Sequence, residues 1–243
     1  MRTPEPVTAT PPRAVHRTML QQVWSDVVFV HWPADPAAVA PLLPPGTTPD
    51  VYDGSTYVGL IAFRNLCTGL FGGPPVPYLG HFPEVNVRLY SVGPDGRRGV
   101  VFRSLDASRL VTAVVARALG VPYAWARMRL GRTGVRWAVT TRRRWPGPAG
   151  AECRLAVAVG APIEPGPLDL FLTARWGLHL TLRGGIPAYW PNQHRPWDLR
   201  AAELLDCDDD LIAAAGLPAP DGPPVSVLYS PGVTTRFGPP EPL

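Results

Sequence analysis

The chain has 243 residues, of which 46% are hydrophobic and 17% charged, with a formal net charge of +4 and a pI near 9.2. This length and composition predict an ordinary soluble globular protein with one sizeable core or at most two small domains. The charge does not indicate a nucleic-acid partner, because the basic residues are scattered apart from residues 142–144 and no nucleic-acid motif accompanies them. No apolar run approaches the ~20 residues that a membrane-spanning helix needs, so no membrane partner is expected.

The cysteines and the N-terminal residues predict a cytoplasmic protein. Cys67, Cys153 and Cys207 are far apart and form no Cys-x-x-Cys pair, which argues against a disulfide framework or a thiolate zinc site. Residues 1–17, MRTPEPVTATPPRAVHR, lack the apolar core of a signal peptide. Their proline-rich composition predicts a disordered N-terminal arm.

In chain order, short strands dominate the predicted elements. The chain's 32 prolines and 24 glycines cut it into short segments, and many of these segments alternate in the manner of strands. Residues 84–90 alternate most clearly, with Glu84, Asn86, Arg88 and Tyr90 on one face. The turn GPDGRRG then leads to a returning strand, so residues 84–105 predict a hairpin. The other predicted strands are 23–32, 55–63, ARMRL, VRWAVTT, CRLAVAVG, LHLTL and VSVLYS.

Helices are few, and the clearest one is predicted over residues 106–120. Asp106 suits its N-cap, Gly120 suits its C-terminal cap, and apolar residues between them repeat at helical spacing. Shorter helices are predicted over 35–43, 167–176 and 208–216. Strand signals run from end to end without a repeat or a linker, so residues 18–243 are expected to form one mainly β domain, a barrel or a sandwich.

No metal or cofactor is expected. No pair of histidines has the spacing of metal ligands, and the acidic run DCDDD, residues 206–210, is interpreted as a solvated helix start. Gly-x-Ser-x-Gly and phosphate-binding glycine loops are absent from the sequence. His31 has an expected structural role, and for His194, which precedes a Pro-Trp turn, structural and ligand-binding roles stay open.

A set of stretches in fixed order resembles the YqjF-like family, an uncharacterised branch of the acetoacetate-decarboxylase-like superfamily. The stretches are FVHWPADPAAVAPLLPPG, DVYDGSTYVGLIAF, FPEVNVRLY, FRSLDA, LDLFLTARW, HRPWDL and LYSPGV. The resemblance implies a mainly β (α+β) fold: an antiparallel, cone-shaped β-barrel around a small-molecule cavity, with a few peripheral helices. It implies no settled activity, because the family itself has none.

The segment RALGVPYAW, residues 117–125, lies where the decarboxylases carry a catalytic lysine after a Gly-x-Pro turn. The resemblance places Tyr123 at the position of that lysine, and all 23 basic residues of the chain are arginines. A Schiff base requires a primary amine, and only the N-terminus could supply one, so lysine-dependent decarboxylation is excluded. By the same resemblance, Arg117 matches an arginine of the family motif, although Ala116 and Ala118 replace its neighbours, and Glu84 matches the acidic residue that faces the lysine.

These residues define a candidate site. Glu84 is the expected proton carrier, Tyr123 the donor of a hydrogen bond to an oxyanion, and Arg117 a clamp for an anion. Each also has an ordinary structural explanation: a solvated strand face, aromatic packing and a helix C-terminus. The expected substrate-binding residues are Arg88, Asn86, Trp125, Arg175 and His194.

Two functions follow from this site. The favoured one is a cofactor-independent enzyme of isomerase, cyclase, dehydratase or lyase type, which acts on a metabolite with a carbonyl or carboxylate group in bacterial specialised metabolism. The alternative is a non-catalytic protein that binds a small molecule on the same fold. The substrate, the reaction and the formation of a homo-oligomer stay open.

Overall fold

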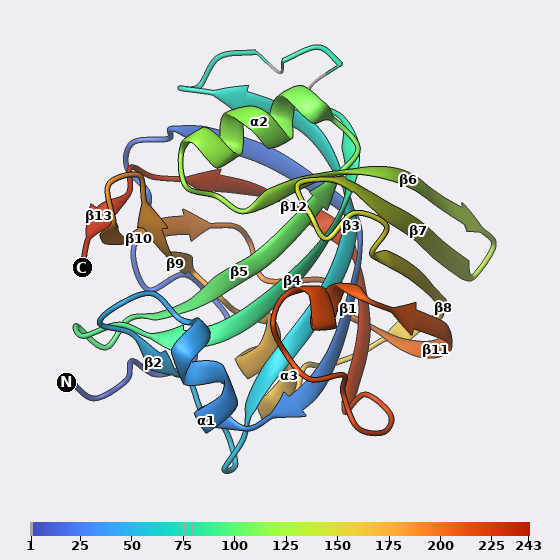
Figure 1. The fold of residues 1–243 in the computed structure, drawn as a ribbon. Helices are drawn as coiled ribbons and strands as arrows, with labels where there is room; N and C mark the ends of the chain where they lie inside the picture. The colour runs from blue at the N-terminus through green and yellow to red at the C-terminus, as the bar shows by residue number, and fades with distance from the viewer. Residues whose placement is uncertain (1, 75, 79) are drawn as a thin grey trace.

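The computed structural model describes residues 2–74, 76–78 and 80–243. Within them the chain is mostly β-strand, with short helices outside the sheet (Figure 1). The strands are β1 (Leu20–Ala34), β2 (Thr48–Pro49), β3 (Thr56–Leu70), β4 (Phe82–Val92), β5 (Arg98–Ala107), β6 (Tyr123–Thr133), β7 (Arg136–Trp145), β8 (Glu152–Pro162), β9 (Gly177–Leu182), β10 (Ile186–Gln193), β11 (Arg200–Asp209), β12 (Ser226–Phe237) and β13 (Glu241–Pro242). The helices are α1 (Pro36–Val39), α2 (Leu110–Ala118), α3 (Pro167–Thr173) and α4 (Leu211–Ala214), and a 3-10 turn, η1, spans Ala40–Leu42.

The strands form one sheet that closes on itself twice. Strands β12, β1, β3, β4 and β5 are neighbours in the sheet, and β4 pairs with β5. Strands β6, β7, β8 and β11 connect β5 back to β12 and complete one ring, whereas β9 and β10 connect the same two strands and complete a second. All pairings are antiparallel except those of β5 with β6 and β9. The predicted mainly antiparallel β fold with peripheral helices is confirmed.

Each of the five shared strands has one face that points into the first ring and one that points into the second, because successive side chains of a strand point to opposite sides. On β4, Val85, Val87 and Leu89 pack in a cluster with Trp137 and Leu155 from the first ring. The alternate residues, including Glu84, therefore face the second ring. Both faces of β4 are buried.

Two sequence predictions about local structure are wrong. The helix predicted over residues 106–120 begins at Leu110 with Arg109 as its N-cap. Asp106 instead lies at the end of β5, fully buried, where it accepts hydrogen bonds from Nε and Nη2 of Arg143 at 3.1 and 2.6 Å. This ion pair holds Asp106 in the sheet. It also buries Arg143, so residues 142–144 do not form one exposed basic run. Gly120 ends the helix with φ +93°, as predicted.

The acidic run over residues 206–210 is also largely strand rather than a helix start. Residues up to Asp209 belong to β11, which pairs with β8, and Asp208 forms an ion pair with Arg154 across the two strands. The helix α4 starts only at Leu211, where the Asp209 carboxylate accepts a hydrogen bond from the Ile212 backbone N–H at 3.0 Å. Cross-strand pairing therefore prevails over the capping pattern in the sequence.

The N-terminal segment, residues 2–17, contains no helix or strand. It lies along the folded body, where the indole of Trp176 donates to the backbone carbonyl of Thr8 at 3.1 Å and the Glu5 N–H donates to the carbonyl of Gly96 at 2.9 Å. Its disorder in solution, and the division at residue 17, stay predictions. Among the described residues, no helix has the length and apolar character that a membrane crossing requires.

Candidate functional site

Strand β5 lies between the two main candidates and brings them together. Glu84 on β4 pairs with Ala107 of β5, and Tyr123, the first residue of β6, pairs with Leu105 of the same strand. The Tyr123 hydroxyl donates a hydrogen bond to Oε2 of Glu84 at 2.8 Å. Nδ2 of Asn86 donates to Oε1 of the same carboxyl group at 3.1 Å. Three residues predicted from the sequence thus form one hydrogen-bonded group.

Burial sets the proton affinity of this group. Glu84 is 2% exposed, and desolvation raises its pKa to about 7, against the opposing effect of its hydrogen bonds with Tyr123 and Asn86. The nearby Asp106 carboxylate adds a smaller upward contribution. Burial, followed by the Glu84 charge, raises the pKa of Tyr123 well above its usual value. Near neutral pH, Glu84 can therefore exchange a proton while Tyr123 keeps its own.

Gln22 of β1 also affects Tyr123. The indole of Trp24 donates to Oε1 of Gln22 at 2.9 Å, which fixes the side-chain amide. Gln22 also lowers the pKa of Tyr123, against the larger upward effects of burial and of Glu84. The Tyr123 hydroxyl itself donates its proton to Glu84. Sequence reasoning missed Gln22, and no local pattern in the sequence singles it out.

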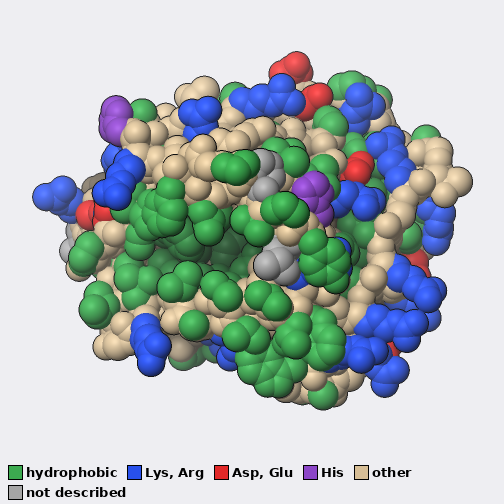
Figure 2. Space-filling model, turned by 90° about the horizontal axis from the view of Figure 1, so that it is seen from above, with side chains coloured by type: hydrophobic (Ala, Val, Ile, Leu, Met, Phe, Trp, Pro, Cys, Tyr) green, Lys and Arg blue, Asp and Glu red, His purple; other side chains and the backbone are tan. Residues whose placement is uncertain are grey.

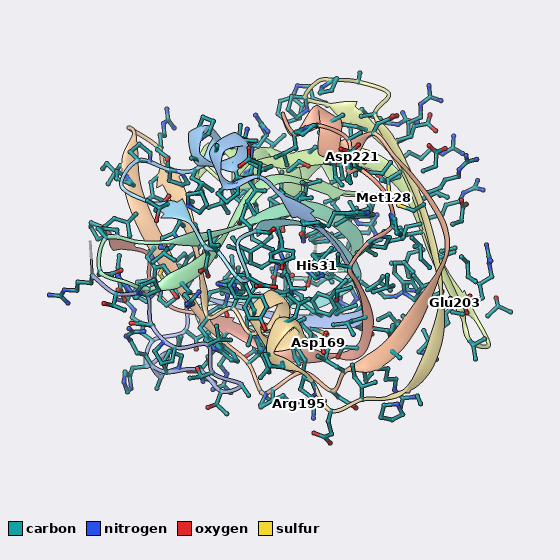
Figure 3. The ribbon with its side chains drawn as sticks, turned by 90° about the horizontal axis from the view of Figure 1, so that it is seen from below. His31, Met128, Asp169, Arg195, Glu203 and Asp221 are labelled. Atoms are coloured by element: carbon teal, nitrogen blue, oxygen red, sulfur yellow. The ribbon has the colours of Figure 1, made fainter. Side chains whose placement is uncertain are left out.

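Arg88 lies further along the same face of β4. It is 8% exposed, with Nη2 donating to the backbone carbonyl of Leu172 at 2.8 Å and Nε donating to the Tyr90 hydroxyl at 3.1 Å. The Tyr90 hydroxyl also lies 2.7 Å from Nε2 of His31, whose pKa burial lowers well below its usual value. Seen from below, His31 of β1 lies in the interior of the molecule (Figure 3). The period-two pattern of β4, continued to Tyr90, could have placed that residue in the site.

His194 lies close to an aromatic wall of this region. Its ring centroid is 4.7 Å from those of Trp176 and Trp197, and Nδ1 donates to the Arg195 carbonyl at 2.6 Å. Burial lowers the pKa of His194 to about 4, and the Arg88 charge contributes in the same direction. His194 is therefore neutral at physiological pH, and with its proton on Nδ1 its other ring nitrogen, Nε2, can accept a hydrogen bond.

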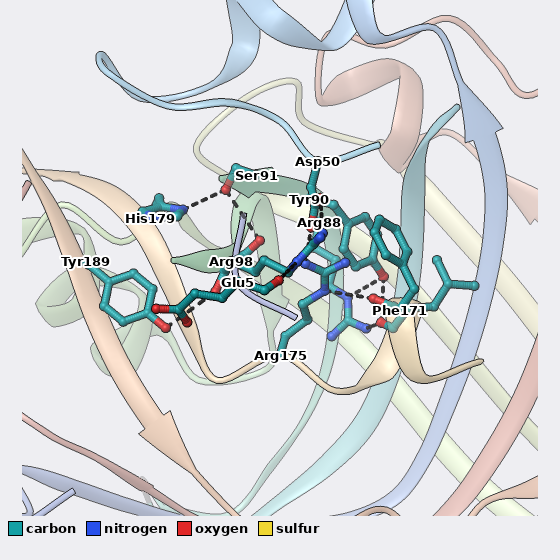
Figure 4. Close-up of polar contacts among 12 residues, drawn as sticks. Glu5, Asp50, Arg88, Tyr90, Ser91, Arg98, Phe171, Arg175, His179 and Tyr189 are labelled. Carbon is teal, nitrogen blue, oxygen red and sulfur yellow. Dashed lines mark hydrogen bonds and ion pairs between the residues drawn. The ribbon is translucent and has the colours of Figure 1, made fainter. Parts of the chain in front are cut away.

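Arg117, Arg175 and Trp125 lie apart from this group. Arg117 is exposed on α2, and Nη1 donates to the backbone carbonyl of Tyr123 at 3.0 Å, so it braces the turn from outside. Arg175 is 4% exposed and pairs with the buried Asp50 carboxylate, which also binds Arg98 (Figure 4). The charge of Arg175 is therefore already matched within the protein. Trp125 is partly buried beneath the guanidinium of Arg144, 5.5 Å from its ring centroid.

The face that carries α2 is hollowed, and hydrophobic side chains gather around the hollow (Figure 2). Glu84 is the third residue of β4, and Tyr123 is the first residue of β6, which follows α2 after a short turn. Both residues therefore lie close to this end of the molecule. A surface pocket of about 360 Å³ is lined by residues such as Pro41 and Arg103 together with Val121 and Pro122 of the turn before Tyr123, and another of about 260 Å³ is lined by residues such as Arg13 and Tyr189. Within the described part of the chain, no group of three or more His, Cys, Asp or Glu residues is placed to hold a metal ion.

The fold is that of acetoacetate-decarboxylase-like enzymes. An enzyme of this kind from Sphingomonas wittichii RW1 has a TM-score of 0.64 at 16% identity, with 96% of each chain covered. The enduracididine biosynthesis enzyme MppR, solved in complex with pyruvate, has a TM-score of 0.63 at 18% identity, with 96% of this chain and 91% of that chain covered. At these identities the likeness shows the fold alone.

The sequence places the chain in a family within this fold. The model of the family DUF2071, described as an uncharacterized conserved protein, matches residues 21–234, and the chain belongs to that family. The uncharacterized protein YqjF of Bacillus subtilis (strain 168) is 30% identical over 212 residues, which cover 85% of this chain and 86% of that protein. The YqjF-like family expected from the sequence is confirmed.

Proposed function

We propose that the protein is a cofactor-independent enzyme that moves a proton on carbon next to a carbonyl group. The reaction is of isomerase, cyclase, dehydratase or lyase type and forms no Schiff base. The observation that carries the proposal is the buried hydrogen bond from Tyr123 to Glu84, a carboxyl group whose pKa is about 7. A general base with a pKa near the working pH both accepts and returns a proton efficiently.

The hydrogen bonds couple proton removal to stabilisation of the enolate. Ionised Glu84 takes a proton from the substrate carbon, and the C–H electron pair moves into the carbonyl to leave charge on its oxygen. Protonation makes Glu84 a weaker acceptor for the Tyr123 hydroxyl, so that hydroxyl is free to turn and donate to the enolate oxygen. Asn86 occupies one acceptor position of Oε1, and each carboxylate oxygen has two, so a position stays open for the substrate proton.

The known neighbours support a carbonyl compound as the ligand. MppR, with the same fold, holds pyruvate in its solved complex. This chain contains no lysine, so its site would treat such a compound by hydrogen bonding and proton transfer instead of imine formation.

The test is exchange of the protons next to the carbonyl in D2O, followed by proton NMR over a panel of ketones and keto acids. With an exchanging compound, Tyr123→Phe is expected to slow exchange by about a hundredfold, because it removes the oxyanion donor. Its stability should fall by about 1–3 kcal/mol, since the buried Glu84 loses a hydrogen-bond partner. Tyr189→Phe, a buried tyrosine of β10 outside the site, is the matched control. Full exchange in Tyr123→Phe would contradict the proposed role.

A non-catalytic binding protein is the second candidate. It is favoured by the aromatic side chains beside the polar group, where Trp24 and Trp197 are stacked with ring centroids 6.2 Å apart and Phe29 lies 5.1 Å from Trp197. Such a wall binds apolar ligands without chemistry. Glu84→Gln separates the two functions: it abolishes exchange if the protein is an enzyme, whereas a compound that binds but is never exchanged by the wild-type chain identifies a binder.

A further inference from the structure

Arg88 is a buried cation without a carboxylate partner. Its guanidinium forms hydrogen bonds to the Tyr90 hydroxyl and the Leu172 carbonyl, both of which are neutral groups. Among the described residues, no Asp or Glu forms an ion pair with it. Burying an unpaired charge is costly, and proteins normally match it with an opposite charge. Arg175, buried nearby, shows the usual arrangement with Asp50.

The surroundings of Arg88 contain aromatic contacts and unmatched hydrogen-bonding capacity. The guanidinium lies 5.6 Å from the ring centroid of Phe29. Gly59 is the residue opposite Arg88 on β3, and a Cβ there would come within 3.0 Å of the His31 ring and 3.2 Å of the Arg88 side chain, so only glycine lets these two side chains pack against β3 at this position. Asn86, between Arg88 and Glu84 on the same face, is 3% exposed, and its Oδ1 has no hydrogen-bond partner. A ligand with a donor group would satisfy that oxygen.

The positions along β4 set the distance between the two ends of this row. Glu84 and Arg88 are four residues apart on one strand, which corresponds to about 13 Å between their Cα atoms. The Glu84 carboxyl group accepts a hydrogen bond from Tyr123. The Arg88 guanidinium instead donates a hydrogen bond to Tyr90, which lies further along the strand. The proton carrier and the unpaired cation therefore do not converge on adjacent atoms of a ligand.

We propose that Arg88 binds the carboxylate of a keto acid whose carboxylate and carbonyl groups are separated by several methylene groups. This inference rests on the proposed function, which places the carbonyl at Tyr123 and Glu84. The planar fork of Arg88 suits a carboxylate, and the aromatic wall covers the methylene chain. Short keto acids such as pyruvate carry the two groups on adjacent carbons and cannot reach both ends. The substrate class thus differs from the pyruvate held by MppR.

Isothermal titration calorimetry of the full chain with three probes tests the inference without requiring turnover. 6-Oxoheptanoate has four methylene groups between carboxylate and carbonyl, 6-oxoheptanamide has the same shape without the charge, and pyruvate is the short acid. We expect 6-oxoheptanoate to bind at least about tenfold more tightly than either of the others, which is the effect of one charge-assisted hydrogen bond. Equal affinity for the acid and the amide, equal or tighter binding of pyruvate, or binding of none of them would overturn it.

Variants then assign the selectivity to Arg88. Arg88→Met is expected to reduce the acid-to-amide affinity ratio to about one, while Arg129→Met, an exposed arginine on β6, leaves it unchanged. If Arg88→Met does not fold, Arg88→Lys keeps a charge but loses the fork, and the ratio should fall at least about threefold. An unchanged ratio in the folded Arg88 variant would overturn the inference. Glu84→Gln is expected to keep the ratio. Selective binding of the acid by a wild-type chain that exchanges none of its protons would remove the proposed function and leave this inference standing.

Discussion

At the scale of single residues, the environment of Glu84 decides its chemistry. A glutamate on a strand face is ordinarily ionised at neutral pH and paired with a nearby arginine. Here Arg88, four residues away, turns to Tyr90 instead, and the neighbours of the carboxyl group are the Tyr123 hydroxyl and the Asn86 amide. Neutral donors offset desolvation only in part, so the pKa stays raised.

This raised pKa predicts a pH dependence of stability. Between pH 4.5, the usual pKa of the group, and about 7, the folded chain keeps a proton that the unfolded chain releases. Stability from this group is therefore lost as the pH rises through that window, and the total cost above it is on the order of 3 kcal/mol. Glu84→Gln removes the titration. The free energy of unfolding of the variant should therefore increase relative to that of the wild type by about this amount between pH 4.5 and 7.5. Urea unfolding at successive pH values measures the difference, and a difference independent of pH would contradict the prediction.

At the scale of elements, α2 has its apolar side outside. Leu110, Val111, Val114 and Val115 repeat at helical spacing, a pattern that normally packs against a core. In the single chain all four are exposed, and Ala113 is the buried residue of the helix. The helix is held by its ends instead, where the exposed Arg117 binds the turn that leads to Tyr123.

Substitution on α2 should therefore cost little. Val115 is 56% exposed, so Val115→Gln is expected to change the free energy of unfolding by no more than about 0.5 kcal/mol. Val139 of β7 is 1% exposed, and Val139→Gln should cost more than about 2 kcal/mol, because it buries an amide among apolar side chains. Urea unfolding of both variants at one protein concentration provides the comparison. A large loss of stability in Val115→Gln would show that this face is covered in solution.

At the scale of the whole molecule, ring closure creates the site. Glu84, Tyr123 and Gln22 come from three strands, and the second ring that encloses them depends on β9, β10 and β12, which follow much later in the chain. The face of β4 that carries Glu84 would be a solvated surface without those strands. The geometry of the site is therefore a property of the closed sheet rather than of one motif.

The lack of lysine is also a property of the whole chain, and it predicts the outcome of imine trapping. Borohydride with acetoacetate should leave the mass of the protein unchanged when its N-terminus is blocked, because no other primary amine is present. Intact-mass spectrometry measures this directly, with an authentic lysine-dependent acetoacetate decarboxylase as the positive control. A stable adduct on the blocked chain would disprove the prediction.

The sequence by itself determined several features of this protein. Its composition excludes a Schiff base on lysine, the alternation over residues 84–90 places Glu84, Asn86 and Arg88 on one face, and the glycine at 120 ends a helix just before Tyr123. These features are local, because they depend on residue chemistry, strand periodicity and backbone conformation.

Only the tertiary structure decided what each residue faces. Periodicity shows that Glu84 and Val85 point to opposite sides of β4, but whether a side is solvated or enclosed depends on strands distant in the sequence. For the same reason Asp106 is a buried ion-pair partner instead of a helix cap, and Arg117 lies outside the site that its motif suggested. Burial and charge pairing are long-range properties, and a local sequence pattern does not contain them.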